Sequence, residues 1–490
     1  MDGSKGQAGG RVSRRAALGV GVAGLAAAAG AAQAQTGGEP SPVAVTVDVV
    51  IVGAGFAGLT AARALRAAGR RVVVLEAGDR VGGRTKPGRI AGEVVDLGGQ
   101  WVGPGQTRLL ALAREFGVAT YPQATAGRSI IDVAGRRASY QGDTPDLGPL
   151  ALAELAIAMG KIEALAGKVP ATRPWEAPEA EILDAQTVET WILANVRSPV
   201  VRSALRLMNR SLFCAEAGEV SMLALLTYAA SAGGFGHMIA TRGGAQDAML
   251  QGGVWRLAAR MADELGPAVV LDAPVASIAQ DETGVTVAAG PRQWRGRYVV
   301  VTAPPTLAGR IQYQPPLPAL RDGLTQRMPL GSVIKVHVAY ARPFWRDQGL
   351  NGQVLSDRTE FGPWFDHSPP DGAIGGLVGF FAGRPAQRWA DRPPQARREQ
   401  VLKDIAAYLG EAALSPIDHI EEVWTQDPWR RGGYITAPGP GVLTAFGAAL
   451  RAPVGRIHWA GAETAEVWAG YIDGAIRSGE RSAQDVDARL

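Results

Sequence analysis

The chain has 490 residues, 47% of them hydrophobic, and this length allows more than one compact unit with a substantial core. Its formal charge is +4, but residues 1–35 alone carry a net charge of +3, so the remainder is nearly neutral. A nearly neutral body offers no electrostatic footprint for a polyphosphate, and nucleic acid is therefore excluded as a partner. The single cysteine, Cys214, excludes an internal disulfide.

The N-terminus has the pattern of a bacterial export signal. Twin arginines, Arg14 and Arg15, precede a weakly apolar Ala/Gly stretch that ends in an A-x-A cleavage site, Ala32-Gln-Ala34. The pattern predicts a Tat signal peptide over residues 1–35, followed by a Pro/Gly-rich linker over residues 36–44. We expect the protein to be periplasmic or secreted. The apolar stretch is short and Gly-rich, so we expect no stable membrane anchor.

The next residues predict a strand, a helix and a second strand. Residues 49–52 are an unbroken apolar run, residues 57–68 have helical composition, and residues 71–75 are again β-branched. Such a strand–helix–strand unit implies a parallel sheet.

A glycine motif lies between the first strand and the helix, where a phosphate loop must lie: Gly53-Ala-Gly55-Phe-Ala-Gly58. Gly53 permits the tight turn, Gly55 lets backbone amides approach a pyrophosphate, and Gly58 lets the helix pack closely on the sheet. Glu76 ends the second strand, 18 residues after Gly58. A carboxylate at that place can accept hydrogen bonds from ribose hydroxyls, so the unit is predicted to bind a dinucleotide.

The rest of the chain alternates between two kinds of segment. Residues 123–249 are Ala/Leu-rich with a helical period, whereas residues 268–305 return to strands joined by a hairpin. Residues 331–425 mix strands with a helix near residues 397–409, and a last strand and helix after residue 456 would close the first sheet. The chain is therefore predicted to weave twice between a dinucleotide-binding lobe and a second lobe, with a site between them.

Three further motifs carry a family resemblance: Gly82-Gly83-Arg84, Asp96-Leu-Gly98-Gly99-Gln100-Trp101 and Ala460-Gly-Ala-Glu463. Together with the glycine loop they closely resemble the flavin-containing amine oxidase family, monoamine oxidases in particular. The resemblance extends over residues 48–486. It implies an α/β fold in which a doubly wound FAD-binding domain, Rossmann-like and of the glutathione-reductase type, is interleaved with an α+β substrate-binding domain.

The resemblance gives the two predicted domains their names. The FAD-binding domain comprises residues 45–122, 250–330 and 426–490. The substrate-binding domain comprises residues 123–249 and 331–425. We assign no metal ligands.

The family also implies which residues hold FAD. Val275 resembles the position whose backbone meets the adenine, and the helix start near Tyr471 resembles the segment beside the N1/O2 edge of the flavin. A helix N-terminus there would stabilise negative charge on the reduced ring. For Glu463 an ordinary capping role is left open. The implied FAD-binding residues are Gly53, Gly55, Phe56, Ala57, Gly58, Glu76, Ala77, Gly83, Arg84, Gly98, Gly99, Gln100, Trp101, Val275, Trp424, Gly461, Glu463, Tyr471 and Ile472.

Two tyrosines and a lysine are the implied catalytic residues. Monoamine oxidases place two tyrosines face to face before the flavin, and Tyr434 and Tyr471 occupy those positions; their rings would form a slot for the amine. Lys335 resembles the family lysine that reaches flavin N5 through a water, and a lysine within an apolar strand is costly unless it is paired or functional. Tyr228, Ile239 and Gln246 fall on substrate-pocket positions, although plain core packing is left open for each.

Animal monoamine oxidases carry a cysteine, bonded to the flavin, just before the first of these tyrosines, and here that residue is Gly433. FAD is therefore expected to be bound without a covalent link. The expected reaction is hydride transfer from the α-carbon of a small-molecule amine to flavin N5. It gives an imine, which hydrolyses to an aldehyde or ketone, and H2O2, with O2 as the acceptor.

Several alternatives stay open at this stage. An L-amino-acid oxidase or a polyamine oxidase would share the fold, and a flavin amine dehydrogenase would pass its electrons to a protein partner. Gln100-Trp101 stands where L-amino-acid oxidases resemble one another in a carboxylate-binding arginine, which favours an amine without a carboxylate. A homodimer is one of the oligomeric states left open.

Overall fold

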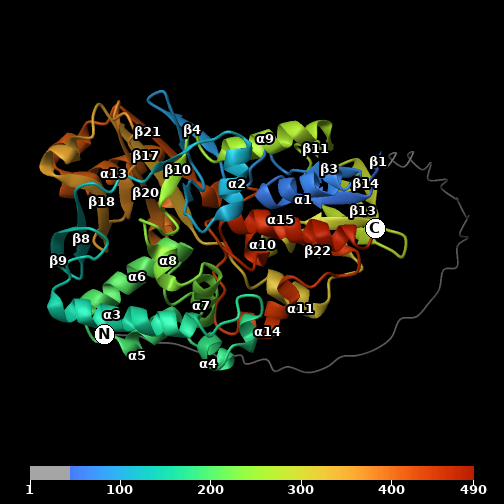
Figure 1. Ribbon diagram of the computed structural model, residues 1–490, viewed down its shortest axis with the longest axis horizontal. Helices are drawn as coiled ribbons and strands as arrows, with labels where there is room; N and C mark the ends of the chain where they lie inside the picture. Colours follow the sequence, from blue (N-terminus) through green and yellow to red (C-terminus); the bar gives the residue numbers. More distant parts are fainter. Residues whose placement is uncertain (1–44) are drawn as a thin grey trace, which may run out of the picture. The chain divides into compact units, whose positions relative to one another are not determined.

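The computed structural model describes residues 45–490, whose helices and strands are drawn in Figure 1. The predicted signal peptide (1–35) and linker (36–44) lie outside the described residues. Within residues 45–490, none of the helices is both long enough and apolar enough to span a bilayer.

A five-stranded parallel sheet forms the centre of the nucleotide-binding part, with the order β11-β3-β2-β15-β22. All four neighbouring pairs are parallel. Strands that are covered on both faces are apolar at nearly every position, which explains the Val/Ile/Leu runs in the sequence. The strands are β2 (Val49–Val52), β3 (Val72–Leu75), β11 (Val269–Val270), β15 (Tyr298–Val301) and β22 (Ile457–Trp459). The predicted strand–helix–strand unit is confirmed.

Helices cover one face of this sheet, and a second sheet covers the other. The helices are α1 (Phe56–Ala67), α2 (Thr107–Glu115), α9 (Trp255–Leu265) and α15 (Ile472–Asp487). The second sheet has the order β1-β14-β13-β12-β16, with β1 (Val45–Thr46), β12 (Ser277–Gln280), β13 (Val285–Ala289), β14 (Arg292–Gly296) and β16 (Gln312–Gln314). Side chains alternate along β2, so that Ile51 joins the helical core and Val50 joins the core with the second sheet.

A seven-stranded sheet lies in the segments predicted to form the substrate-binding domain, at the upper left of Figure 1. Its strand order is β21-β17-β20-β19-β18-β8-β9. Its strands are β8 (Arg128–Val133), β9 (Arg136–Gln141), β17 (Val333–Tyr340), β18 (Leu350–Ser356), β19 (Trp364–Asp366), β20 (Gly375–Ala382) and β21 (Asp418–Val423). Helices α12 (Arg384–Ala390) and α13 (Pro394–Leu409) pack on this sheet. All eight residues of β17 are buried, Lys335 among them.

The hairpin of β8 and β9 corrects one sequence expectation. The segment from residue 123 was expected to be helical, but its first part pairs as two antiparallel strands and joins β18. The β-branched run Ile130-Ile131 and the turn glycine Gly135, at φ +81°, account for the strands. Overall Ala/Leu content hid this short β signal.

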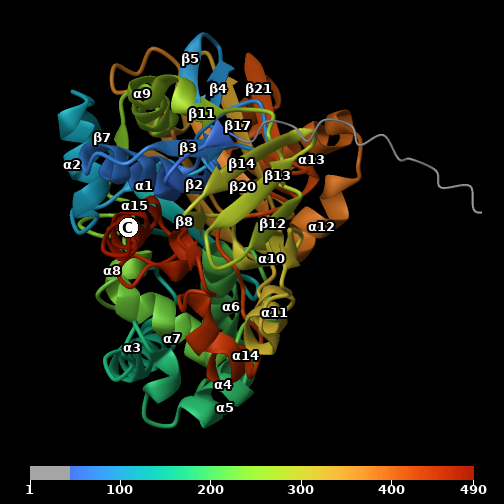
Figure 2. The same ribbon diagram turned by 90° about the vertical axis from the view of Figure 1, so that its right-hand side faces the viewer.

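Helices follow from residue 149 onward and form a separate layer, seen in the lower part of Figure 2. Thr187, Ser198 and Ser221 each cap the N-terminus of a helix by accepting a backbone hydrogen bond. The helices of this layer are α3 (Pro149–Ala166), α4 (Ala180–Ala185), α5 (Val188–Asn195), α6 (Pro199–Phe213), α7 (Met222–Ser231) and α8 (Phe235–Ile239).

The remaining strands and α-helices connect these layers. They are the sheet of β6 (Trp101–Val102), β10 (Ala248–Leu250) and β7 (Thr120–Pro122), the hairpin of β4 (Pro87–Ile90) and β5 (Glu93–Asp96), and helices α10 (Pro305–Ala308), α11 (Ala319–Thr325) and α14 (Val442–Phe446). The boundaries of the two predicted domains stay a prediction.

Candidate active site

A cavity of about 940 Å³ opens at the carboxyl edge of the parallel sheet. Gly53, Glu76, Thr302 and Gly461 follow four neighbouring strands and all line it. Crevices at this edge are the usual ligand sites of open α/β sheets. The same cavity continues to the seven-stranded sheet and to α6 and α7, so one continuous space joins the two parts of the chain.

The glycine loop leaves room for a diphosphate. Gly53 has a φ of +103°, and a Cβ added to Gly58 would collide with the Gly53 carbonyl, so both positions require glycine. Helix α1 has no side-chain N-cap and no acidic residue in its first turn, and Phe56 and Ala57 line the cavity. The free amides of a helix N-terminus bind phosphate, so this cradle fits the pyrophosphate of FAD.

Glu76 keeps an acceptor position for a ribose. Its Oε1 accepts from the Gly78 amide at 3.0 Å and from Arg430 at 3.1 Å, whereas Oε2 accepts only from the Ala54 amide at 2.9 Å. A carboxylate offers about four lone-pair positions. One on Oε2 is therefore left for a ribose hydroxyl, as the sequence prediction requires.

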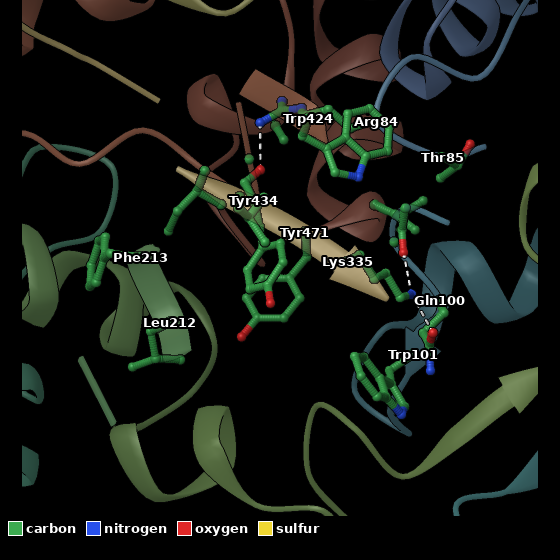
Figure 3. Close-up of a pocket in the computed structure, with 18 of the residues that line it drawn as sticks. Arg84, Thr85, Gln100, Trp101, Leu212, Phe213, Lys335, Trp424, Tyr434 and Tyr471 are labelled. Carbon is green, nitrogen blue, oxygen red and sulfur yellow. Dashed lines mark hydrogen bonds between the residues drawn. The ribbon is translucent and has the colours of Figure 1, made fainter. Parts of the chain in front are cut away.

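Arg84 connects the loop that contains Gly82-Gly83-Arg84, here called the cofactor loop, to the C-terminal segments around Tyr434 and Glu463. Its guanidinium makes a bidentate ion pair with Glu463, at 2.6 and 3.0 Å. It also donates to the Tyr434 carbonyl at 2.7 Å, a bond drawn in Figure 3. Burial opposes the charge on Arg84, but the Glu463 carboxylate outweighs it and raises the pKa of Arg84 above its usual value. Glu463 itself holds Arg84 and does not line the cavity.

A second helix N-terminus faces the cavity at Tyr471, the N-cap of α15. The first-turn carboxylate, Asp473, points elsewhere: it accepts from the amides of Arg108 and Leu109 and so caps α2. The N-terminal dipole of α15 is thus free to act on a negative charge in the cavity. This arrangement fits the N1/O2 edge of a flavin.

Lys335 projects from β17 and lines the cavity. Its Nζ donates to the Gly98 carbonyl at 2.8 Å and to Oε1 of Gln100, and lies 5.5 Å from the centre of the Trp101 ring (Figure 3). Burial lowers the pKa of Lys335 to about 7, against the attraction of Asp96. The predicted buried lysine therefore lies among residues of the Asp96–Trp101 motif.

Tyr434 and Tyr471 project into the same part of the cavity (Figure 3). Phe380 packs edge-on against Tyr434 at 5.5 Å, and Trp468 packs edge-on against Tyr471 at 5.0 Å. Burial raises the pKa of both phenols, so both are neutral near pH 7. Two neutral, edge-supported rings can orient an amine between their faces.

The wall beyond the tyrosines is largely apolar. Tyr228 packs edge-on against Phe213 at 5.3 Å, and Ile239 lines the same region. Gln246 donates from Nε2 to the Met238 carbonyl at 3.4 Å, and its buried Oε1 has no partner among the described residues. Gln246 can therefore accept a hydrogen bond from a ligand.

The structure brings nearly all predicted site residues to this cavity; Gly58 and Glu463 support it from behind. Sequence reasoning missed Thr302, although the predicted strand before it was a signal that could have found it. It also missed Arg430, Phe213 and Phe380, which come to the cavity from other elements and carry no local motif.

The fold and the site define an FAD-dependent oxidoreductase. The family model for flavin containing amine oxidoreductases matches residues 56–487. The probable flavin-containing monoamine oxidase A of Dictyostelium discoideum is 39% identical over 446 residues, which cover 90% of this chain and 98% of that protein. The L-amino acid dehydrogenase of a Synechocystis species is 39% identical over 452 residues, which cover 90% of this chain and 94% of that protein.

Among solved structures, cyclohexylamine oxidase from Brevibacterium oxydans IH-35A superimposes with a TM-score of 0.87 at 36% identity, covering 91% of this chain and 99% of that chain. The chain belongs to the flavin-containing amine oxidoreductase family. The predicted family, fold class and FAD cofactor are confirmed, whereas the roles of the individual site residues stay predictions.

The buried lysine predicts a pH-dependent stability. Between about pH 7 and 10.5 Lys335 is deprotonated in the folded chain but protonated in the unfolded chain, so the free energy of unfolding rises with pH in this window. Burial raises the pKa of Asp96 from 3.8 to about 6. Between these two pH values Asp96 is protonated in the folded chain but not in the unfolded chain, so the free energy of unfolding falls as the pH rises in that window. Lys335→Met is expected to remove a slope of up to about 1.4 kcal/mol per pH unit above pH 7.

Urea denaturation of the FAD-loaded protein at pH 7, 8.5 and 10 measures this slope. Lys403→Met, at an exposed position of α13, is the matched control and should keep the slope of the parent. Equal slopes in the parent and the Lys335→Met variant would contradict the assignment.

Proposed function

We propose that the enzyme oxidises a largely apolar amine without a carboxylate, uses O2 as the acceptor, and releases an imine and hydrogen peroxide. Bound FAD would supply the redox chemistry, namely uptake of a hydride from the α-carbon of the amine and transfer of two electrons, with two protons, to O2. The observation that carries the proposal is the single cavity that joins the phosphate loop to Tyr434, Tyr471 and Lys335.

The chain's own residues orient the amine and exclude water. The Tyr434 and Tyr471 rings border the place where the amine would lie, and their faces attract its nitrogen. The apolar wall around Phe213 accepts the substituent and displaces water from it. Lys335, held by Gly98 and Gln100, supplies a hydrogen-bond donor in the cavity that contains the two tyrosines. Its charge depends on pH because its pKa is lowered to about 7.

Non-covalent FAD is part of this proposal. Gly433 offers no sulfur to the flavin, and the single cysteine of the chain, Cys214, is buried and does not line the cavity. Burial also raises the pKa of the Cys214 thiol to about 12, which disfavours the nucleophilic thiolate.

A second candidate is the oxidation of an L-amino acid. Arg242 lines the cavity with an exposed guanidinium and donates to the Thr125 hydroxyl at 3.1 Å, so a cation is available to a substrate carboxylate. The similarity to an L-amino acid dehydrogenase also supports it. The first candidate is preferred because the surroundings of Tyr434 and Tyr471 are apolar and Arg84 is already paired with Glu463.

Matched substrates separate the two candidates. 2-Phenylethylamine and L-phenylalanine share a side chain and differ in the carboxylate, and putrescine adds a second ammonium. Anaerobic flavin bleaching is expected to be at least about 100-fold faster with 2-phenylethylamine, because a charge buried without a partner costs several kcal/mol. In air, the same amine should yield peroxide.

Faster bleaching by L-phenylalanine, reduced in an Arg242→Gln variant, would establish the second candidate instead. Bleaching without peroxide in air would show that the electrons pass to another acceptor. Faster bleaching by putrescine would assign a polyamine substrate.

A further inference from the structure

Arg430 lies at the nucleotide end of the cavity, on a segment that no nucleotide motif includes. Its Nη2 donates to Glu76 Oε1 at 3.1 Å, and both side chains are only 7% exposed. Glu76 directly follows β3, whereas Arg430 lies in the loop that leads to Tyr434. The pair therefore fastens this loop to the carboxyl edge of the parallel sheet.

One half of the Arg430 guanidinium can still donate hydrogen bonds to a ligand. Nη1 makes no hydrogen bond within residues 45–490; its charge is compensated by a longer ion pair, 3.6 Å, with Asp427 Oδ2. Arg430 lines the cavity together with Glu76. A second arginine, Arg80, lies near Arg430; its Nη1 donates to the Thr85 carbonyl at 2.6 Å, and its buried Nη2 has no hydrogen-bond partner among residues 45–490. Nη1 of Arg430 is thus a cationic donor on a nearly buried side chain that borders the cavity.

Gly78 makes the position of this guanidinium possible. A Cβ added to Gly78 would lie 2.9 Å from Nη1 of Arg430 and 3.4 Å from the Trp429 ring. The backbone at Gly78 has no positive φ, so the glycine is not required by the turn. Its lack of a side chain instead leaves the space that Arg430 fills.

We propose that Arg430 is an FAD-binding residue that donates from Nη1 to the adenosine side of the cofactor, that is, to its ribose or to the phosphate joined to that ribose. In this fold the pyrophosphate lies at the N-terminus of α1 and the adenosine ribose at the end of β3, which is the end that Arg430 shares with Glu76. A guanidinium donating to a phosphate oxygen makes a charge-assisted hydrogen bond. The inference concerns cofactor binding and stands whichever amine is oxidised.

The test compares FAD with FMN, which lacks the adenosine half. The protein is dialysed against graded concentrations of each flavin, and the bound fraction is read from the flavin spectrum. Arg430→Met is expected to weaken FAD binding about 10- to 100-fold, the range for one hydrogen bond to a charged group, and to change FMN binding less than about threefold. Arg430→Lys should recover part of the lost FAD affinity.

Further variants keep the test decisive if Arg430→Met folds poorly. Gly78→Leu keeps Arg430 and Glu76 but occupies the space of the guanidinium, and it should weaken FAD selectively as well. Arg431→Met changes an exposed neighbour and should bind both flavins as the parent does. Unchanged FAD affinity in both Arg430→Met and Gly78→Leu, or an equal loss for FAD and FMN, would overturn the proposal.

Discussion

Replacing Glu463 by alanine is expected to destabilise the protein by about 3–5 kcal/mol, because the change leaves the Arg84 guanidinium without its carboxylate. The Glu463 side chain is 1% exposed and that of Arg84 is 24% exposed, so water cannot fully replace the lost partner. Arg84 would keep only the Tyr434 carbonyl. The segment that carries Tyr434 should therefore loosen together with the cofactor loop.

Urea denaturation at a fixed excess of FAD measures this loss. Glu176→Ala is the matched control, because its ion pair with Arg173 is exposed on both sides and should contribute at most about 1 kcal/mol. A Glu463→Ala variant within 1 kcal/mol of the parent would refute the structural role given to the Arg84–Glu463 pair.

Alanine at Tyr434 or Tyr471 is expected to slow amine-dependent flavin reduction by about 100-fold, because the amine would lose the walls that aim its α-carbon. The FAD content of the Tyr434→Ala variant should stay close to that of the parent, because Tyr434 is not among the implied FAD-binding residues. Anaerobic stopped-flow bleaching with a saturating amine gives the rate directly.

Phenylalanine at the same two positions distinguishes the contribution of the aromatic ring to the rate from that of the hydroxyl. Because the proposed slot depends on the ring faces, Tyr434→Phe and Tyr471→Phe should keep most of the rate. If the alanine variants bleach as fast as the parent, these tyrosines do not form the amine site.

The parts of the site that the sequence predicted are those set by neighbouring residues. The phosphate loop needs only its own glycines between a strand and a helix, and the structure places Gly53, Gly55 and α1 as expected. The buried position of Lys335 was likewise readable from the apolar run of β17 around it. Motif resemblance then brought Tyr434 and Tyr471 to one site, although no local pattern joins them.

The sequence by itself therefore determined the parallel sheet and its glycine loop, because both depend on short-range backbone geometry and burial. Its motifs determined the family, and the residues that hold the cofactor stay a prediction. Only the tertiary structure decided that Glu463 pairs with Arg84 and that Arg430 pairs with Glu76. These partners are 379 and 354 residues apart in the chain. Such pairs form where the paths of distant loops happen to meet, and the residue types at either end carry no signal of that meeting.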